Sequence, residues 1–364
     1  MEPKKLFVAA TQQNEGKTTI SLGLLAAFHE LCPPVGFIKP VGQRYVEVDG
    51  VRVDEDVALM RAIFPTECSL ADMSPITIGR SFTRDYILDP DRGALEKKIV
   101  DSFTRVAAGR NLVVIEGTGH AGVGSVFDMS NADVAKLLGA KAIIVTSGGI
   151  GRPIDEVMLN QSLFRDHGVD LLGVILNKVK ADKLDSIATF VDEGLARKGI
   201  DLLGVIPHED ILAHPTMRQV LDEVGGDLLN GEPFLSNEIE TIIVGAMTAH
   251  RALDYIYRNT LLITPGDRDD LILAAMSSCV VEADKANCVA GMLLTGGSRP
   301  HENIMRLLRR TQIPVILVQN DSYSAASAVN NLQIKIQPMD KKKIVMARRL
   351  VKRFVNVQKI FEGL

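Results

Sequence analysis

The sequence contains no tryptophan, and aromatic residues make up only 5% of its 364 residues. This scarcity argues against a surface that stacks nucleic-acid bases on aromatic rings. There is no secretory signal, and no apolar run approaches the ~20 residues of a membrane-spanning helix. The seven histidines form no HExxH motif and the cysteines show no CxxC spacing, which indicates reduced thiols and no zinc site. The four cysteines are Cys32, Cys68, Cys279 and Cys288. We therefore expect a cytoplasmic protein without a membrane segment.

Charge is distributed unevenly along the chain. The net charge is −4, but residues 340–364 contain eight Lys or Arg and two Asp or Glu. Apolar Ile344, Ala347, Val351 and Phe354 recur in this segment at helical spacing. The segment could contact nucleic acid or an acidic partner, or it could be an amphipathic helix that closes a domain and exposes a basic face. We favour the helix, and we do not expect nucleic acid as a partner.

Length and apolar patterning predict two α/β domains. Short apolar runs alternate with helix-like stretches in the first half, which predicts a parallel sheet with helices on both faces. These runs lie at 6–10, 35–38, 112–115, 142–145, 172–176 and 202–206. A second set, at 241–244, 260–264, 289–294 and 314–318, predicts a smaller α/β domain. Glycine and proline clusters separate the two sets, so we expect a first domain at 1–212, a linker at 213–236 and a second domain at 237–364.

A phosphate-binding motif follows the first apolar run. A strand, a glycine-containing loop, Gly-Lys-Thr and a helix form the layout of a P-loop, whose backbone N–H groups and helix N-terminus cradle phosphate oxygens. Lys17 would bridge the β- and γ-phosphates of a nucleotide, and the Thr18 hydroxyl would hold Mg²⁺. Thr11 stands where the P-loop pattern has a glycine. The loop reads Thr11-Gln12-Gln13-Asn14-Glu15-Gly16-Lys17-Thr18-Thr19.

Polar residues follow other predicted strands, and ligands of parallel sheets bind at the carboxyl ends of the strands. Lys39 follows the run 35–38, where it could attract phosphate or be a surface lysine before a turn. Glu116 ends the run 112–115, a costly place for a carboxylate unless it is paired or binds metal. Among the acids at 54–56, which could simply cap a helix, we favour Asp56 as a metal ligand. Asn177 ends a later strand and could read a purine edge.

The segment 117–122 spells GxGxxG, the pattern of dinucleotide-binding loops. That pattern requires a helix to begin within it, whereas here the helical pattern starts only near Asn131. We therefore interpret the segment as a mobile loop over the phosphate site and do not expect NAD to bind.

Together these motifs resemble the dethiobiotin synthetase family. That family has an ATAQQ- or GTDT-type loop before Gly-Lys-Thr, then Lys-Pro-Val, an acid near the next helix, Glu-Gly, a strand-ending Asn and Gly-Val-Ile-Pro. The family's loop also lacks the first P-loop glycine. The similarity covers about residues 4–210, and its motifs here are 11–18, Lys39-Pro40-Val41, Asp56, Glu116-Gly117, Asn177 and Gly204-Val205-Ile206-Pro207.

The resemblance implies a domain that binds ATP and Mg²⁺. It implies that Asp56 and Glu116 complete a metal site begun by Thr18, and that Asn177 contacts adenine. Lys39 would face a carboxylate or carbamate that is phosphorylated, which makes Lys17 and Lys39 the candidates for catalysis. The implied nucleotide contacts are Thr11, Asn14, Glu15, Gly16, Lys17, Thr18, Thr19, Asn177 and Pro207.

Two positions depart from that family. Gln12 stands where its members carry Asp, and Gln43 where they carry a Ser that binds substrate. Residues 43–100 also show little likeness. Diaminopelargonate is therefore not the expected substrate.

The second half resembles the DRTGG domain, over about residues 236–350. The resemblance rests on 264–268, 293–297 and 313–315. Loops after two strands could offer N–H groups and a guanidinium to an anion, or they could be structural turns in which Asp267 and Arg268 pair locally. The residues of this possible second site are Asp267, Arg268, Thr295, Gly296 and Gly297.

The two halves together resemble the N-terminal region of long bacterial phosphate acetyltransferases. The transacetylase domain of those enzymes is not in this sequence, so we do not expect an acetyltransferase. The resemblance favours a nucleotide-responsive regulatory module. The alternative is an ATP-dependent ligase that activates a carboxylate or carbamate, as in dethiobiotin or cobyrinic acid diamide synthesis, with a small carboxylate or amine as its substrate. A homo-oligomer is expected from the families.

Overall fold

The computed structural model describes residues 2–281 and 289–364, without the side chains of 278–281. The chain forms two compact units. The first unit contains the residues up to Glu209 together with Ile336–Leu364, and the second is Asp210–Lys335. The second unit is therefore inserted between two stretches of the first.

The first unit is built on a six-stranded sheet in the order β10-β9-β8-β1-β7-β2. Every neighbouring pair is parallel. Its central strands are continuous apolar runs because both faces of the sheet are covered. The strands are β1 (Lys4–Ala10), β2 (Val35–Ile38), β7 (Leu112–Glu116), β8 (Lys141–Ser147), β9 (Leu171–Val179) and β10 (Leu202–Pro207).

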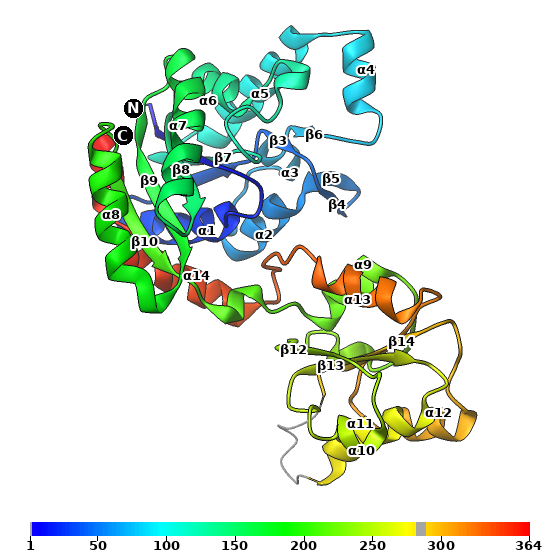
Figure 1. Ribbon diagram of the computed structural model, residues 1–364. Helices are drawn as coiled ribbons and strands as arrows, with labels where there is room; N and C mark the ends of the chain where they lie inside the picture. Colours follow the sequence, from blue (N-terminus) through cyan, green and yellow to red (C-terminus); the bar gives the residue numbers. More distant parts are fainter. Residues whose placement is uncertain (1, 282–288) are drawn as a thin grey trace. The chain divides into compact units, whose positions relative to one another are not determined.

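Helices cover both faces of this sheet, as the apolar pattern predicted (Figure 1). On one face, α1 (Lys17–Leu31) lies beside α14 (Lys341–Phe354). The other face carries α5 (Arg92–Ala107), α6 (Asn131–Leu138) and α7 (Gly151–Asp166), with α8 (Leu184–Ala196) beside β10. The shorter elements are β3 (Val41–Gly42), β4 (Tyr45–Val48), β5 (Val51–Asp54), α2 (Glu55–Ile63), α3 (Leu70–Met73), β6 (Ile76–Thr77), α4 (Phe82–Leu88), η1 (Ser125–Phe127), η2 (Ala181–Lys183) and α15 (Val357–Gly363).

The second unit carries a five-stranded sheet in the order β11-β15-β14-β13-β12, in which β11 alone runs antiparallel to its neighbour. Side chains alternate between two apolar layers: Leu261 and Ile263 pack with α9 and α13, and Leu262 packs with α10, α11 and α12. The strands are β11 (Asp227–Asn230), β12 (Thr241–Val244), β13 (Thr260–Pro265), β14 (Gly291–Thr295) and β15 (Val315–Leu317). The helices are η3 (Asp210–Ala213), α9 (Met217–Val224), η4 (Glu232–Phe234), α10 (Ala249–Ala252), α11 (Asp269–Val281), α12 (Glu302–Leu308) and α13 (Ser322–Asn330).

The stretch 213–236, which we expected to be a linker, belongs to this second unit. It contains α9 and the sheet strand β11. Its glycines allow the backbone to approach β15 closely: a Cβ on Gly226 would lie 2.3 Å from the Leu317 carbonyl oxygen, and one on Gly231 would lie 2.5 Å from the Pro314 nitrogen. These glycines therefore mark close strand packing, whereas the sequence pattern suggested a linker with a short helix inside it.

The basic C-terminal segment packs in the first unit, whereas we expected it to end the second domain. Helix α14 buries Ile344, Ala347, Leu350 and Val351, so the amphipathic-helix interpretation holds for this segment. The helix packs closely on α1 because Gly23 has no side chain; a Cβ there would lie 2.3 Å from Val351 Cγ2. Hydrophobic burial against α1 thus explains the apolar spacing of the segment.

The GxGxxG segment is a loop, and α6 begins only at Asn131, as expected. The loop is not loose, in contrast to our expectation. The Asn131 side chain accepts from the Thr118 N–H at 3.0 Å and donates to the carbonyls of Thr118 and His120. Asn160 accepts from the Ala121 N–H at 2.7 Å. Two buried asparagines therefore fix this loop against α6 and α7.

Within residues 2–281 and 289–364, no helix combines the length and apolarity needed to cross a bilayer. Cys32 and Cys68 are free thiols. Cys288 lies outside the described residues, and the side chain of Cys279 is likewise not described.

Candidate functional site

The predicted P-loop connects β1 to α1 as a strand–loop–helix unit. Gly16 adopts a left-handed conformation with φ of 92° and precedes the first residue of α1, Lys17. As the N-cap residue, Gly16 has no side chain to satisfy the first amides of the helix. The N-terminus of α1 therefore presents its amides and the positive end of its dipole, a geometry that suits a phosphate.

Thr11 is accommodated at the position where the P-loop pattern has glycine. Its side chain is buried, and its hydroxyl donates to Thr146 Oγ1 of β8 at 3.0 Å. The Thr11 N–H also donates to the Val145 carbonyl at 2.9 Å. The substitution therefore ties the start of the loop to the neighbouring strand.

Two residues at the end of β9 hold the loop from the other side. Asn177 is buried and its amide donates to the Glu15 carbonyl at 2.8 Å, while Lys178 Nζ donates to the Asn14 carbonyl at 2.5 Å. A Cβ on Gly16 would lie 2.3 Å from Asn177 Nδ2. Asn177, expected at adenine, is thus engaged with the loop backbone in this structure.

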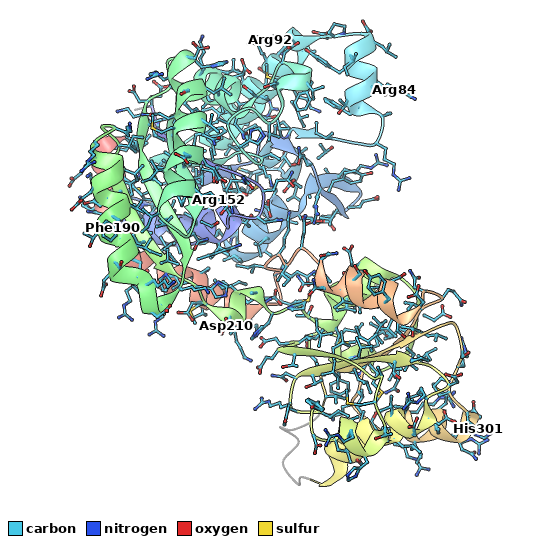
Figure 2. All side chains as sticks on the ribbon, in the orientation of Figure 1. Arg84, Arg92, Arg152, Phe190, Asp210 and His301 are labelled. Atoms are coloured by element: carbon cyan, nitrogen blue, oxygen red, sulfur yellow. The ribbon has the colours of Figure 1, made fainter. Side chains whose placement is uncertain are left out.

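The two departures from the family pattern lie at the exposed edge of the loop. Gln12 donates to Glu156 of α7 at 2.8 Å, and that carboxylate also pairs with Arg152. Arg152 is labelled in Figure 2. Gln13 donates to Gln43 at 3.2 Å. Neutral amide side chains therefore lie along the exposed edge of the loop.

Next to the loop lies a buried acidic cluster, formed by Asp54, Asp56, Glu116 and the ammonium of Lys39. Lys39 Nζ lies 2.9 Å from Asp54 Oδ1 and 3.7 Å from Glu116 Oε1, and it contacts Asp56 Oδ2. The side chains of all four residues are at most 6% exposed. The sheet brings them together because β2 and β7 are parallel neighbours whose ends carry Lys39 and Glu116.

Thr18 links the loop to this cluster. Its hydroxyl donates to Glu116 Oε1 at 3.2 Å. Glu116 Oε2 is buried and has no hydrogen-bond partner within the described part of the chain, and the same is true of Glu15 Oε2. An unpartnered buried carboxylate oxygen beside a P-loop hydroxyl suits a cation ligand, since such an oxygen is costly to leave unpaired.

Burial and charge shift the pKa values of the cluster strongly. Burial raises the pKa of Glu116 to about 7, and repulsion from Asp56 adds to this shift, while attraction by Lys39 opposes it. Burial also raises the pKa of Asp54, although Lys39 opposes the shift. For Lys39 itself, burial favours the neutral amine, but Asp56, Glu116 and Asp54 outweigh burial and raise its pKa above the usual value. Lys39 is therefore a fixed cation among carboxylates of variable charge.

The donor set fits Mg²⁺ held jointly with phosphates. Among the residues that the structure describes, no three His, Cys, Asp or Glu side chains form a ligand set by themselves. Mg²⁺ at nucleotide sites commonly takes only one or two protein ligands and completes its shell with phosphate and water. Thr18 and Glu116 could supply those two ligands.

Asp54 is the cluster member that sequence reasoning did not single out. It caps α2 by accepting from the Asp56 N–H at 2.9 Å and also pairs with Lys39. The pattern Asp54-Glu55-Asp56 at a helix start contained a signal, because alternate residues at the end of a strand can point to the same side. Only the tertiary fold shows that both acids reach the same ammonium.

In the second unit, the groups expected at an anion site are bonded within the protein. The Arg268 guanidinium binds both carboxylate oxygens of Asp270, at 2.8 and 3.0 Å, and donates to the Met247 carbonyl at 2.8 Å. The Gly296 and Gly297 amides donate to the carbonyls of Asn320 and Val318.

The neighbouring residues in these loops are also engaged or closely packed. Thr295 is buried and shares a hydrogen bond of 2.7 Å with Ser322. Arg268 pairs locally, but with Asp270 rather than with the exposed Asp267. A Cβ on Gly266 would lie 1.8 Å from the Ser298 carbonyl oxygen. An anion at these loops would have to displace existing hydrogen bonds.

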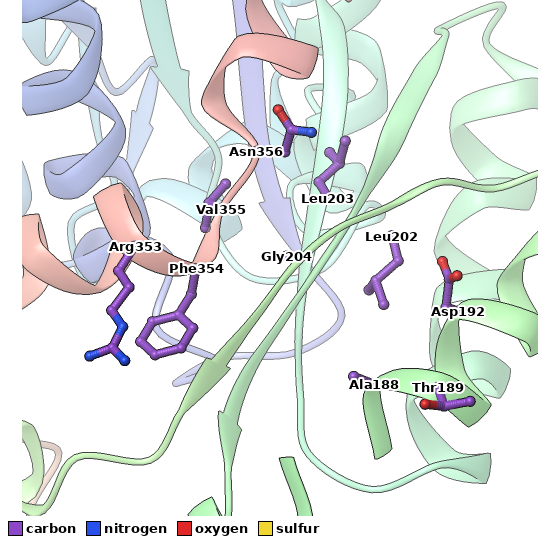
Figure 3. Close-up of a pocket in the computed structure, with 10 residues that line it drawn as sticks. All are labelled: Ala188, Thr189, Asp192, Leu202, Leu203, Gly204, Arg353, Phe354, Val355 and Asn356. Carbon is purple, nitrogen blue, oxygen red and sulfur yellow. The ribbon is translucent and has the colours of Figure 1, made fainter. Parts of the chain in front are cut away.

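A groove of about 600 Å³ lies at the β10 edge of the first unit (Figure 3). Asp192 of α8 and Arg353 of α14 are the charged residues that line it. None of the predicted site residues lines this groove. Of those residues, Pro207 ends β10, and its backbone pairs with Val179.

Comparison with known proteins agrees with the resemblances to the DRTGG domain and to phosphate acetyltransferases. Residues 4–216 match the AAA domain family model, and residues 219–332 match the DRTGG domain model. The phosphate acetyltransferase of Nitratidesulfovibrio vulgaris is 27% identical over 362 residues, which cover 96% of this chain and 50% of the relative. The corresponding protein of Pseudomonas putida is 32% identical over 358 residues, 92% of this chain and 48% of the relative.

The chain thus spans about half the length of the curated relatives it matches. Among solved structures, the CBS and DRTGG domains of the regulatory region of Clostridium perfringens pyrophosphatase, complexed with diadenosine tetraphosphate, are 23% identical with a TM-score of 0.28. That match covers 33% of this chain and 48% of the other. The prediction of a P-loop domain followed by a DRTGG domain, as in the N-terminal region of phosphate acetyltransferases, is confirmed by the family matches. The chain belongs to the AAA domain family through residues 4–216 and carries a DRTGG domain at residues 219–332.

Proposed function

We propose that the first unit binds ATP with Mg²⁺ and that the protein is a nucleotide-responsive regulatory module. The observation that carries this proposal is the junction of Thr18 and Glu116, where the first turn of α1 meets a buried carboxylate with an unpartnered oxygen. A P-loop alone would suit any phosphate. A P-loop hydroxyl bonded to a strand-ending carboxylate suits a nucleotide that carries a divalent cation.

In this proposal each residue has a physical role. Lys17 and the amides of the first turn of α1 neutralise phosphate charge, and Thr18 with Glu116 provides the metal ligands. Asn177 and Lys178 position the loop by holding the carbonyls of Glu15 and Asn14. Bound Mg²⁺ would neutralise phosphate charge. Asp56 and Asp54 hold Lys39 beside the metal ligands.

The regulatory part of the proposal rests on domain content. A nucleotide domain is followed by a DRTGG domain, as in relatives named phosphate acetyltransferase, and the matched part is about half of each relative. We infer that nucleotide binding in this part adjusts the activity of a partner or of a further domain. Self-association into a homo-oligomer is part of the same proposal.

An ATP-dependent ligase is the second candidate, because Lys17, Thr18, Lys39, Asp56 and Glu116 lie together as phosphoryl transfer requires. In that case an oxyanion of a carboxylate or carbamate would attack the γ-phosphate of ATP, a mixed anhydride would form and ADP would leave, with the ammonium of Lys39 beside the oxyanion. The neutral side chains of Gln12 and Gln43 at the loop edge favour the regulatory module over the ligase.

Calorimetric titration with ATP and Mg²⁺, followed by a product assay on the same sample, tests both candidates. Binding without turnover supports the regulatory module. Turnover accelerated by one member of a panel of carboxylates and amines supports the ligase. Absence of ATP binding would overturn both.

A further inference from the structure

Lys39 occupies the centre of the acidic cluster. Its ammonium contacts Asp54, Asp56 and Glu116, and it is the cation on which their oxygens converge. All three carboxylates are at least 95% buried, so water contributes little to their solvation. The ammonium of Lys39 therefore lies beside Glu116, where a divalent cation bound to that carboxylate would lie.

The charges explain why an ammonium and a metal ion would compete. Three carboxylates face the ammonium of Lys39, and the charge of Lys17 also acts on Glu116, so ammonium groups already occupy the surroundings of these oxygens. A metal ion that approached Glu116 while Lys39 remained in place would be repelled at short range in a medium of low dielectric constant. The ammonium and a metal ion would therefore compete for the side of Glu116 that Lys39 approaches, where Nζ lies 3.7 Å from Oε1.

A bound nucleotide would change this balance. Phosphate oxygens at the N-terminus of α1 are a second anionic site near Lys39, because Thr18 of that helix already touches Glu116. A lysine ammonium on its four-carbon stem can move between neighbouring oxygens by rotamer changes. Lys39 could then leave Glu116 for the phosphates, and Glu116 would be available to a cation.

We propose that Lys39 is an internal counter-ion that keeps the metal site closed until nucleotide binds, so that divalent cation and nucleotide bind cooperatively. The inference rests on the proposed nucleotide site and adds a positioning role for Lys39 that is independent of turnover. It accounts for a fully buried lysine surrounded by more carboxylates than its charge can neutralise. It also gives Asp54 and Asp56 a purpose, since they hold the ammonium away from the loop in the absence of nucleotide.

The test measures binding of Mn²⁺, used in place of Mg²⁺, by the loss of the free-ion signal in electron paramagnetic resonance. Full-length wild type and Lys39→Met are titrated without nucleotide and with ADP. Wild type should bind Mn²⁺ at least about tenfold more tightly with ADP than without it. Lys39→Met should bind Mn²⁺ without nucleotide at least about tenfold more tightly than wild type, which reduces the dependence on ADP.

Lys97→Met is the matched control, because it removes an exposed lysine of α5 whose ion pair with Asp101 lies outside both the cluster and the loop. It should leave nucleotide-free Mn²⁺ affinity at the wild-type value. If Lys39→Met unfolds with three unneutralised carboxylates, Lys39→Met with Asp54→Asn removes one of those charges and makes the same prediction.

Two results would overturn the inference: equal Mn²⁺ affinity of wild type and both Lys39 variants without nucleotide, or tight nucleotide-free binding by wild type. Both are distinct from failure of the proposed function. That failure would be the absence of ADP and ATP binding in a separate calorimetric titration of wild type.

Discussion

Both units place glycine-containing loops after parallel strands, but the two sets of loops use their polar groups differently. In the first unit, the loop after β1 leads into a helix whose N-cap residue has no side chain, beside an unpartnered oxygen of Glu116. In the second unit, the amides of Gly296 and Gly297 and the guanidinium of Arg268 are already bonded within the protein. Glycine loops at strand ends therefore predict a ligand only where their hydrogen-bonding groups remain available.

The difference has a structural origin. In the first unit, the side chains of Asn177 and Lys178 donate to the carbonyls of Glu15 and Asn14 in the loop. In the second unit, the segment after β15 supplies the carbonyls of Val318 and Asn320 to the glycine amides. The carbonyls of Asn14 and Glu15 thus anchor the first loop, whereas the glycine amides anchor the second.

Lys17→Ala should produce the largest effect, a loss of ATP affinity of about 100-fold or more, because it removes the cation that would face the phosphates. Isothermal titration calorimetry with Mg²⁺ measures it. Lys97→Ala, on the exposed face of α5, is the control and should bind as wild type does. If Lys17→Ala bound ATP as tightly as wild type, the loop after β1 would not be a nucleotide-binding P-loop.

Glu116→Gln tests the buried carboxylate through pH. The pKa of Glu116 is raised from 4.5 to about 7, so the folded state holds its proton more tightly than the unfolded state does. Its charge therefore destabilises the fold progressively as pH rises from about 4.5 to 7, and the full penalty remains above pH 7. Relative to Glu116→Gln, wild type should lose roughly 2 kcal/mol of unfolding free energy between pH 5 and pH 8.

Urea denaturation of both proteins at the two pH values measures that difference. The comparison with Gln cancels the titration of groups common to both proteins. A difference that does not change with pH would show that Glu116 is ionised at both values, as an acid paired fully with Lys39 would be.

Gly16→Ala and Gly296→Ala compare the two units directly. Both glycines have positive φ, 92° and 76°, so alanine is strained at either position. At Gly16 the new Cβ would also lie 2.3 Å from Asn177 Nδ2, whereas at Gly296 it would meet no atom of the described residues within 4 Å. Gly16→Ala should cost about 2 kcal/mol and Gly296→Ala about 1 kcal/mol in chemical denaturation. Equal costs would mean that Asn177 moves freely and does not hold the loop.

Arg268→Met should have the smallest effect, a destabilisation of about 1 kcal/mol, because Arg268 and its partner Asp270 are partly exposed. ATP affinity should not change. Inorganic phosphate should not bind at the Arg268 loop, so it should change the melting temperatures of wild type and variant equally. A phosphate-dependent increase in wild type that disappears in Arg268→Met would show that these loops do bind an anion.

The sequence predicted the parallel sheet well, because strands buried on both faces are nearly continuous apolar runs. It also identified Lys17, Thr18, Lys39, Asp56 and Glu116, which the fold brings to one end of the sheet. Strand order does not follow from local pattern, so the meeting of Lys39 with Asp54 could not be foreseen. That contact depends on the path of the chain through the hairpin of β4 and β5.

Two predictions failed for reasons of the same kind. Gly225 and Gly226 have the composition of a linker, but their positive φ values and the close contact of Gly226 with β15 belong to a packed sheet edge. The amphipathic spacing of 344–354 shows that one face is buried, but it does not show which surface covers it. Local sequence indicates the type of an element more reliably than its tertiary partner.

The packing of α14 on α1 has a consequence for synthesis of the protein on the ribosome. About 310 residues separate Leu31 from Lys341. At a synthesis rate of roughly 5–20 residues per second, α14 therefore emerges on the order of a quarter of a minute to a minute after α1. During that interval the surface around Gly23, later covered by Ala347 and Val351, is exposed while the whole second unit is translated. The nascent P-loop helix is therefore a candidate substrate for chaperones that bind emerging apolar segments.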